Sequence, residues 1–173
     1  MNRKTLLKLI NSNLLPVEAK SEAQAIKIFK KGGTVSNLSD FSNSYDVMSY
    51  AVSRDGRNLR LCSDRLKDNE SIVTAAVRNY GEAILYANER YRKIESVVID
   101  AFISSNGELS LNDVDSSFKK DLTVAFVAIM SNPRELFNVD TSLIHNKDFM
   151  SLVRDELSNR PKEEKDYQKV IGM

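Results

Sequence analysis

The sequence has 173 residues and a mass of 19.5 kDa, a length that suits one compact domain or a short array of repeats. It contains 25 Lys and Arg against 24 Asp and Glu, so the net charge of +1 indicates no polyelectrolyte role, and 42% hydrophobic residues exclude an intrinsically disordered chain. A single Cys excludes an intramolecular disulfide framework, and the longest apolar runs, such as 124–130, are too short to cross a membrane.

Residues 1–33 are predicted to form a basic segment of two helices. The first covers 3–12, and no signal-peptide cleavage pattern follows it, so we expect a cytoplasmic protein. The second covers 21–31, where Ser21 and Gln24 form a capping-box pair, and two glycines stop it. The segment has seven basic and two acidic residues, a net charge of +5.

A polar loop or linker is expected at 34–43, and the chain beyond it repeats itself. Shifting 44–67 by 25 residues superposes it on 69–92, and two looser copies follow, the last displaced by two further residues. The copies align on four alanines, Ala51, Ala76, Ala101 and Ala128. The repeated segment is therefore predicted to hold units near 44–68, 69–93, 94–120 and 121–146, then a terminal helix at 147–158 and a charged tail at 159–173.

Each unit is predicted to be a helix, a tight turn and a short helix. Apolar residues four and three before the Ala, at the Ala and one after it lie on one helical stripe. Seven before the Ala stand the N-cap residues Ser44, Asn69 and Asp121, whereas the third unit has Ile94. Five after it stand the helix-stopping residues Gly56, Gly81, Asn106 and Pro133. We expect both glycines to end their helices with positive φ, and an all-α fold throughout.

The spacing of these residues resembles a family of unknown function. In the first unit it comprises Val47-Met48, Ala51-Val52, Gly56, Leu59 and Cys62, and in the second Ile72-Val73, Ala76-Val77, Gly81, Ile84 and Ala87. The pattern is similar to that of a domain-of-unknown-function family of tandem helical repeats of about 25 residues, found in phage, bacterial and protist proteins. The resemblance is close over 45–92, implies an all-α repeat array, and brings no catalytic motif.

No residues indicate catalysis, a cofactor or a metal site, and we expect none of the three. Cys62 occupies the register of Ala87 and is interpreted as a packing residue, and the single histidine, His145, stands in a polar segment. We therefore expect a non-catalytic protein that binds another macromolecule, in the first place a protein. The family resemblance leaves open a phage or bacterial accessory or inhibitory role.

Charge supplies the candidate binding residues. Four arginines cluster in the first unit and three lysines in the second predicted helix, and a surface of this kind suits an acidic partner. The alternative function is a nucleic-acid-binding module that uses the same basic residues, whereas interspersed acidic residues favour an ordinary solvated surface. The candidate partner-binding residues are Arg54, Arg57, Arg60, Arg65, Lys27, Lys30 and Lys31.

Overall fold

The protein is all-α. The computed structural model describes residues 15–159, and within that range the chain forms helices and a single isolated parallel bridge between Val17 and Val35, with no named strand. No helix in 15–159 has the length and apolar character that a membrane span requires. The first predicted helix, at 3–12, and nearly all of the charged tail lie outside the described residues.

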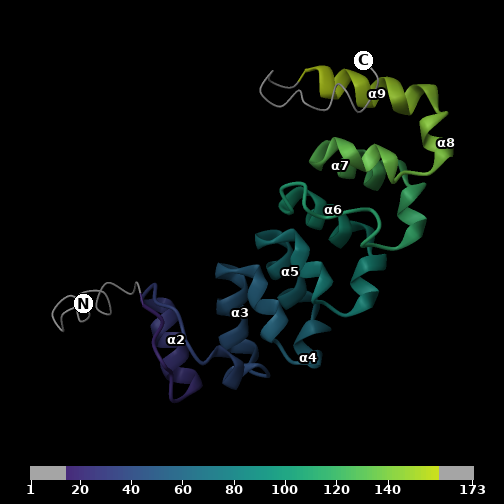
Figure 1. The fold of residues 1–173 in the computed structure, drawn as a ribbon. Helices are drawn as coiled ribbons and strands as arrows, with labels where there is room; N and C mark the ends of the chain where they lie inside the picture. The colour runs from purple at the N-terminus through teal and green to yellow at the C-terminus, as the bar shows by residue number, and fades with distance from the viewer. Residues whose placement is uncertain (1–14, 160–173) are drawn as a thin grey trace.

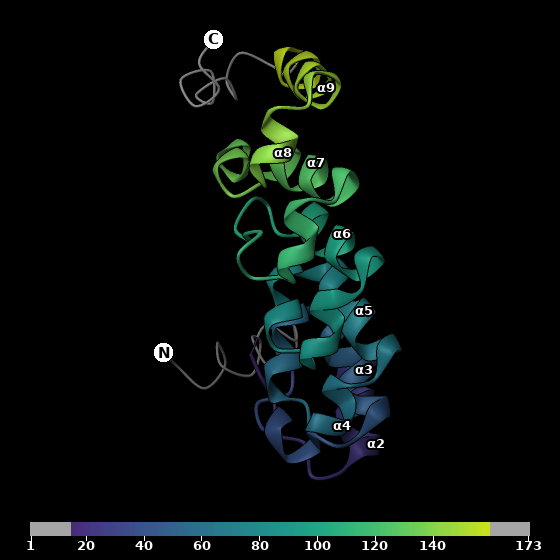
Figure 2. The same cartoon turned by 90° about the vertical axis from the view of Figure 1, so that its right-hand side faces the viewer.

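The helices stack into an arc. The long helices are α2 (Glu22–Lys30), α3 (Tyr45–Arg54), α5 (Glu70–Asn79), α6 (Glu95–Ser104), α7 (Leu122–Ser131) and α9 (Lys147–Ser158). They follow one another along the inner side of the arc, while the short helices α4 (Asp64–Lys67) and α8 (Thr141–Ile144) lie on its outer side (Figure 1). A view turned by 90° shows the same succession as a column from α2 to α9 (Figure 2).

Short 3-10 helices connect the long ones. They are η1 (Leu38–Phe41), η2 (Gly56–Leu61), η3 (Gly81–Leu85), η4 (Glu89–Lys93), η5 (Ser116–Lys119) and η6 (Pro133–Phe137). Helices η2, η3 and η6 begin five residues after the aligned Ala, as the predicted unit requires. The predicted loop 34–43 contains one 3-10 turn, η1, whose Leu38 is buried.

The predicted apolar stripe is confirmed in all four units. The buried residues of α3 are Val47, Met48, Ala51 and Val52, and those of α5, α6 and α7 occupy the same four registers. All four aligned alanines are 0% exposed. Helix α9 continues the pattern as a partial fifth copy, because Phe149, Met150 and Val153 hold three of the four registers and are buried. One stripe per helix thus builds a continuous core along the stack.

The predicted N-caps are also confirmed. The side chains of Ser44, Asn69 and Asp121 each accept a hydrogen bond from the backbone N–H three residues later. Ile94 precedes α6 without such a bond, as expected. Ser21 caps α2 in the same way, and Asn146, at the equivalent position of the fifth copy, caps α9.

The expected conformation of Gly56 and Gly81 is wrong. In the described chain only Gly32, Gly107 and Asn106 have positive φ, and α3 and α5 end instead at extended residues with φ of −149° and −150°. The glycines are required by space. A Cβ on Gly56 would lie 2.2 Å from the carbonyl oxygen of Ala76, and one on Gly81 would lie 2.1 Å from that of Ala101. Each glycine therefore lets the turn of one unit touch the helix of the next.

The third unit makes this contact differently. Asn106 stands at the glycine register with a φ of 51°, the left-handed conformation that the sequence led us to expect at the two glycines. The next residue, Gly107, takes over the close approach, with a built Cβ 2.9 Å from the carbonyl oxygen of Ser131. The side-chain amide of Asn132 then donates to the Gly107 carbonyl at 3.1 Å. The extra residues predicted from the sequence follow this altered turn.

A backbone hydrogen bond closes every unit. The amide of Ser63 donates to the Ser42 carbonyl at 2.8 Å, and the equivalent amides are those of Asn88, Asp115 and Asp140, bonded to Lys67, Arg92 and Lys119. Donor and acceptor are 21 residues apart in three units and 23 apart in the third. The two-residue displacement inferred from the sequence is thus an insertion inside the third unit, absorbed before its closing bond.

Helix α2 ends as its sequence predicts. Gly32 has a φ of 85°, its amide donates to the Phe29 carbonyl, and the amide of Gly33 donates to Ile28. These two bonds form a Schellman motif, which needs a left-handed residue at Gly32.

Gly81→Ala and Gly81→Asn are expected to destabilise the protein by similar amounts, about 2–3 kcal/mol each, because either side chain places a Cβ against the Ala101 carbonyl. Chemical denaturation monitored by circular dichroism measures the difference. At Gly32 nothing lies within 4 Å of a built Cβ, so a side chain there meets only the restriction of the positive φ. Gly32→Asn should therefore lower the free energy of unfolding by well under about 1 kcal/mol. A clear advantage of Asn over Ala at position 81 would contradict the steric explanation.

Candidate functional site

Arg54 belongs to the joint between α2 and α3. Its guanidinium donates to the carbonyls of Phe29 at 2.8 Å and Gly33 at 3.2 Å, and it lies 5.9 Å from the centre of the Phe29 ring. These carbonyls stand at the C-terminal end of α2, where free acceptors and the negative end of the helix dipole favour a cation. Arg54 therefore holds one helix of the stack against the next.

Other units use a polar residue at the same register. Asn79, the counterpart of Arg54 in α5, donates to the Ser53 carbonyl at 3.3 Å and accepts from the Gly56 amide at 2.7 Å. In α7 the hydroxyl of Ser131 donates to the Phe102 carbonyl at 2.9 Å. In three of the four units the side chain at this position, Arg54, Asn79 or Ser131, thus donates a hydrogen bond to a carbonyl of the preceding helix.

Arg65 has an equally structural environment. It donates from Nε to the Asn43 side chain at 3.0 Å and from its terminal nitrogen to the Asn43 carbonyl at 2.6 Å. Arg90, 25 residues later, binds the side chain and carbonyl of Asp68 in the same way. Both arginines tie the end of a unit to the residue before its own N-cap, so this pair belongs to the repeat.

Arg57 and Arg60 are exposed on η2, on the outer side of the array. Arg57 forms an ion pair with Asp55 at 2.9 Å and lies 5.9 Å from the Tyr80 ring centre, and the hydrogen bond between Arg57 and Asp55 is the main reason that the pKa of Asp55 is lowered. Of the four clustered arginines, these two leave most of their charge open to a partner.

The lysines of α2 are exposed as well. Lys27 and Lys30 lie in its last turn, where they complement the helix dipole, and Lys31 is its C-cap residue. Lys27 and Lys31 line a shallow hollow of about 500 Å³ together with Val17 and Ile28. The structure therefore separates the seven candidate residues into a basic edge on α2, an outer pair on η2, and two arginines committed to the scaffold.

The residues with possible nucleophilic or basic chemistry are placed as packing and surface groups. Cys62 is 5% exposed, and burial raises the pKa of its thiol to about 11, so it is protonated at neutral pH. His145, the C-cap residue of α8, is exposed, and its Nδ1 lies 2.7 Å from the carbonyl oxygen of Thr141, the first residue of that helix. Within 15–159 no three His, Cys, Asp or Glu side chains gather where they could hold a metal ion.

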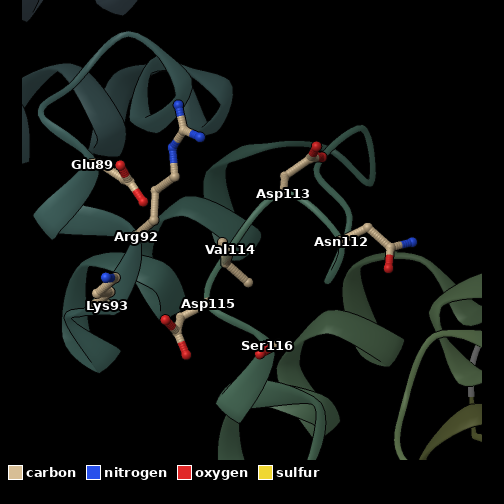
Figure 3. Close-up of a pocket in the computed structure, with 8 residues that line it drawn as sticks. All are labelled: Glu89, Arg92, Lys93, Asn112, Asp113, Val114, Asp115 and Ser116. Carbon is tan, nitrogen blue, oxygen red and sulfur yellow. The ribbon is translucent and has the colours of Figure 1, made fainter.

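A polar hollow of about 290 Å³ lies between η4 and the inserted loop of the third unit (Figure 3). Glu89, Arg92 and Lys93 line one side, and 112–116 line the other. Two acidic residues of this hollow form hydrogen bonds with residues near them in the chain. Asp113 accepts a hydrogen bond from the Ser110 amide at 3.0 Å, and hydrogen bonds from Ser117 lower the pKa of Asp115. The guanidinium of Arg92 donates to the Leu85 carbonyl at 2.9 Å. These groups stabilise the insertion.

Glu82 is the unusual titratable group of the array. It is 8% exposed, and neither of its carboxyl oxygens has a hydrogen-bond partner among the described residues. Burial is the main cause of its raised pKa, and the neighbouring carboxyl of Glu108 raises it further. Two neighbouring ionised carboxylates offer acceptors and no donor, so the position beside Glu108 favours the protonated form of Glu82.

The inner face of the stack differs sharply between units. We define the inner face as the residues one, five, six and nine after each N-cap, which lie opposite the buried stripe. In α5 they are Glu70, Thr74, Ala75 and Arg78, whereas in α7 they are Leu122, Phe126, Val127 and Met130. The scaffold therefore accepts polar residues at three of these four positions. In α7, Phe126, Val127 and Met130 are partly buried against the core, whereas Leu122 is 53% exposed.

Two apolar hollows flank α7. One, of about 360 Å³, lies between α6 and α7 and includes Ile103, and the other, of about 560 Å³, lies between α7 and α9 and includes Leu122 and Leu152. Phe126 lines both. Ile103, Leu122 and Leu152 are 66%, 53% and 52% exposed, a large exposure for aliphatic residues gathered on one face.

Sequence reasoning missed this surface. Its signal is the segment 122–130, in which eight of nine residues are apolar, more than one buried stripe can use. The repeat register assigns this segment to the fourth repeat helix, and its run 124–130 is too short for a membrane span, but neither observation separates the buried stripe from the further apolar residues.

Comparison with known protein families finds a match that covers the first two units. Residues 44–92 match the model of a family described as a domain of unknown function (DUF4116), so this part of the chain is similar to that family. No curated protein and no solved structure matches the chain.

Arg54→Ala is expected to destabilise the protein by about 1 kcal/mol and to increase hydrogen exchange at the α2 amides, since the carbonyls of Phe29 and Gly33 lose the guanidinium of Arg54 as a donor. Arg60→Ala, at an exposed outer position, should change stability by less than about 0.5 kcal/mol. Hydrogen-exchange mass spectrometry and urea denaturation measure both effects. Equal behaviour of the two variants would exclude a capping role for Arg54.

Glu82→Gln is expected to stabilise the protein at neutral pH. Because the folded pKa of Glu82 lies above its unfolded value, the folded state binds the proton more tightly, and stability falls as pH rises through that folded pKa. Gln removes this loss, so the gain should vanish below about pH 4, where the carboxyl is protonated in both states. Thermal unfolding from pH 3 to 8 measures it, with Glu89→Gln on the exposed surface as the control. A pH-independent gain would contradict the assignment.

Proposed function

We propose that this is a non-catalytic helical-repeat protein that binds another protein through the inner face of α6, α7 and α9. The observation that carries the proposal is the register comparison: three of the four inner-face positions are polar in α5, and the same positions in α7 are apolar and at least partly exposed. Stacked repeats commonly present partners with an extended surface of this kind.

The exposed apolar side chains of the inner face carry a risk of aggregation, and the fold does not require them to be apolar. Exposed aliphatic residues gathered on one face favour aggregation, and a soluble scaffold built from the residues of α5 would avoid that risk. Leu122 occupies the register of Glu70, and Ile103 that of Arg78. A partner that covers these side chains accounts for both their exposure and their clustering.

The alternative function is nucleic-acid binding by the basic residues. The exposed pair Arg57 and Arg60 and the lysines of α2 support it, whereas Arg54 and Arg65 donate to carbonyls within the chain. Phosphate contacts need open cations in a row, and the two basic groups stand on different elements, α2 and η2. The protein-binding proposal therefore has the stronger support.

Affinity capture from the native host tests the proposal with three baits: the wild-type chain, Leu122→Gln/Leu152→Gln, and Arg57→Glu/Arg60→Glu. All four positions are exposed, so thermal unfolding should show three folded proteins of similar stability. We expect a nuclease-resistant protein partner that is retained by the arginine variant and reduced at least about tenfold with the leucine variant, a loss of about 1.4 kcal/mol of binding. A partner removed by nuclease, or lost only with the arginine variant, would favour the alternative.

A further inference from the structure

We propose that the partner segment bound by this inner face is an amphipathic α-helix with basic residues flanking its apolar side. The inference rests on the proposed function of the surface and specifies the chemistry of its occupant. It follows from the shape of the apolar surface, from the secondary structure that surrounds it, and from its charge.

The shape of the apolar surface on α7 suits a partner segment that carries a long, narrow row of apolar side chains. Leu122, Phe126 and Met130 are spaced by four residues and form one line along α7, about 12 Å long at 1.5 Å per residue. The two hollows lie on either side of this line and meet at Phe126. Leu152 borders the hollow on α9, and Ile103 borders the other on α6. Side chains spaced at i, i+4 and i+7 on a partner helix match such a surface.

The secondary structure favours a helical partner. The apolar line is the side of a helix, where backbone N–H and C=O groups are bonded along the helix axis, so the surface offers an incoming chain side chains and no sheet edge. An extended peptide pressed onto it would bury unpaired backbone groups, each at a cost of about 1–3 kcal/mol. A helix satisfies its own backbone and avoids that cost.

The charge of this half of the array favours a basic flank. Residues 94–159 contain eleven acidic and five basic side chains, a net charge of −6. Asp148 lines the larger hollow, and Asp155 and Glu156 follow it on the exposed surface of α9. None of these three carboxylates forms an ion pair with another residue of the described chain. Basic side chains beside the apolar stripe of a partner helix would pair with them.

The test uses three synthetic peptides of about 18 residues, or roughly 27 Å of helix, added to the full chain. The first carries leucines on one helical face and lysines elsewhere, the second replaces every lysine by glutamate, and the third is the lysine peptide with two central prolines that break its helix. Titrations followed by NMR report both the affinity and the residues contacted.

The lysine peptide is expected to perturb the signals of Leu122, Phe126 and Leu152. It should bind at least roughly tenfold more tightly than the glutamate and proline peptides at low salt, and the advantage over glutamate should shrink as salt screens the charges. Asp148→Asn should weaken binding of the lysine peptide about two- to threefold. Leu122→Gln/Leu152→Gln should abolish it, whereas the control Phe137→Gln, at a 71% exposed apolar residue of η6, should leave it unchanged.

Equal affinity for the lysine and glutamate peptides would overturn the basic flank, and equal affinity for the proline peptide would overturn the helix. Two results would show that the face has another occupant: concentration-dependent self-association that the double Gln variant abolishes, or nuclear Overhauser contacts between Leu122 and residues 160–173 without peptide.

If the peptides fail while the captured protein still depends on Leu122 and Leu152, only this inference is wrong. If no captured protein depends on those residues, the proposed function is wrong as well.

Discussion

The spacing of the array depends on the contact between a turn and the helix of the next unit. At Gly56 and Gly81 the turn lies so close to a helix carbonyl that a single methyl group would occupy the same space. Because the amide of Gly56 is also bonded to the side chain of Asn79, the contact fixes the height and the rotation of one unit on the next. The buried stripe can then repeat every 25 residues with the same four registers. Small residues at the contact, and not helix propensity, thus determine how the helices stack.

The same contacts determine which residues are free to carry function. Helix ends need donors, and the array supplies them from Arg54, Asn79 and Ser131, which differ in charge and share one task. The end of a unit needs a tie to its own N-cap region, and Arg65 and Arg90 provide it. The buried stripe, the turns and these ties stabilise the array. The residue types that differ most between units lie on the inner face, which is mostly polar in α5 and apolar in α7. A scaffold held together from its outer and lateral sides leaves that face available.

Much of the fold could be predicted because each repeated residue type has one local role. N-caps such as Asn69 and the stripe residues around Ala76 act within a single helix, and periodicity exposes them directly. Gly81 was identified as a turn residue for the wrong reason: its φ is negative, and its partner is the Ala101 carbonyl, 20 residues away in sequence. A glycine that is required because φ is positive and a glycine that is required because another atom lies close to it look identical in a sequence. Only the stacked structure distinguishes them.

The candidate site was harder to predict for a related reason. Arg54 stands where the second unit has Asn79, a difference that suggests a position free to vary, yet both residues bond a carbonyl of the preceding helix. Comparing residue types across units therefore overestimates what is free to vary when different side chains perform the same task. The comparison becomes reliable where the replacement changes what the position can contact, as between Glu70 and Leu122. A carboxylate and an aliphatic side chain share no interaction, so a scaffold that accepts both requires neither. This is why we propose that a partner outside the scaffold covers the exposed aliphatic residue.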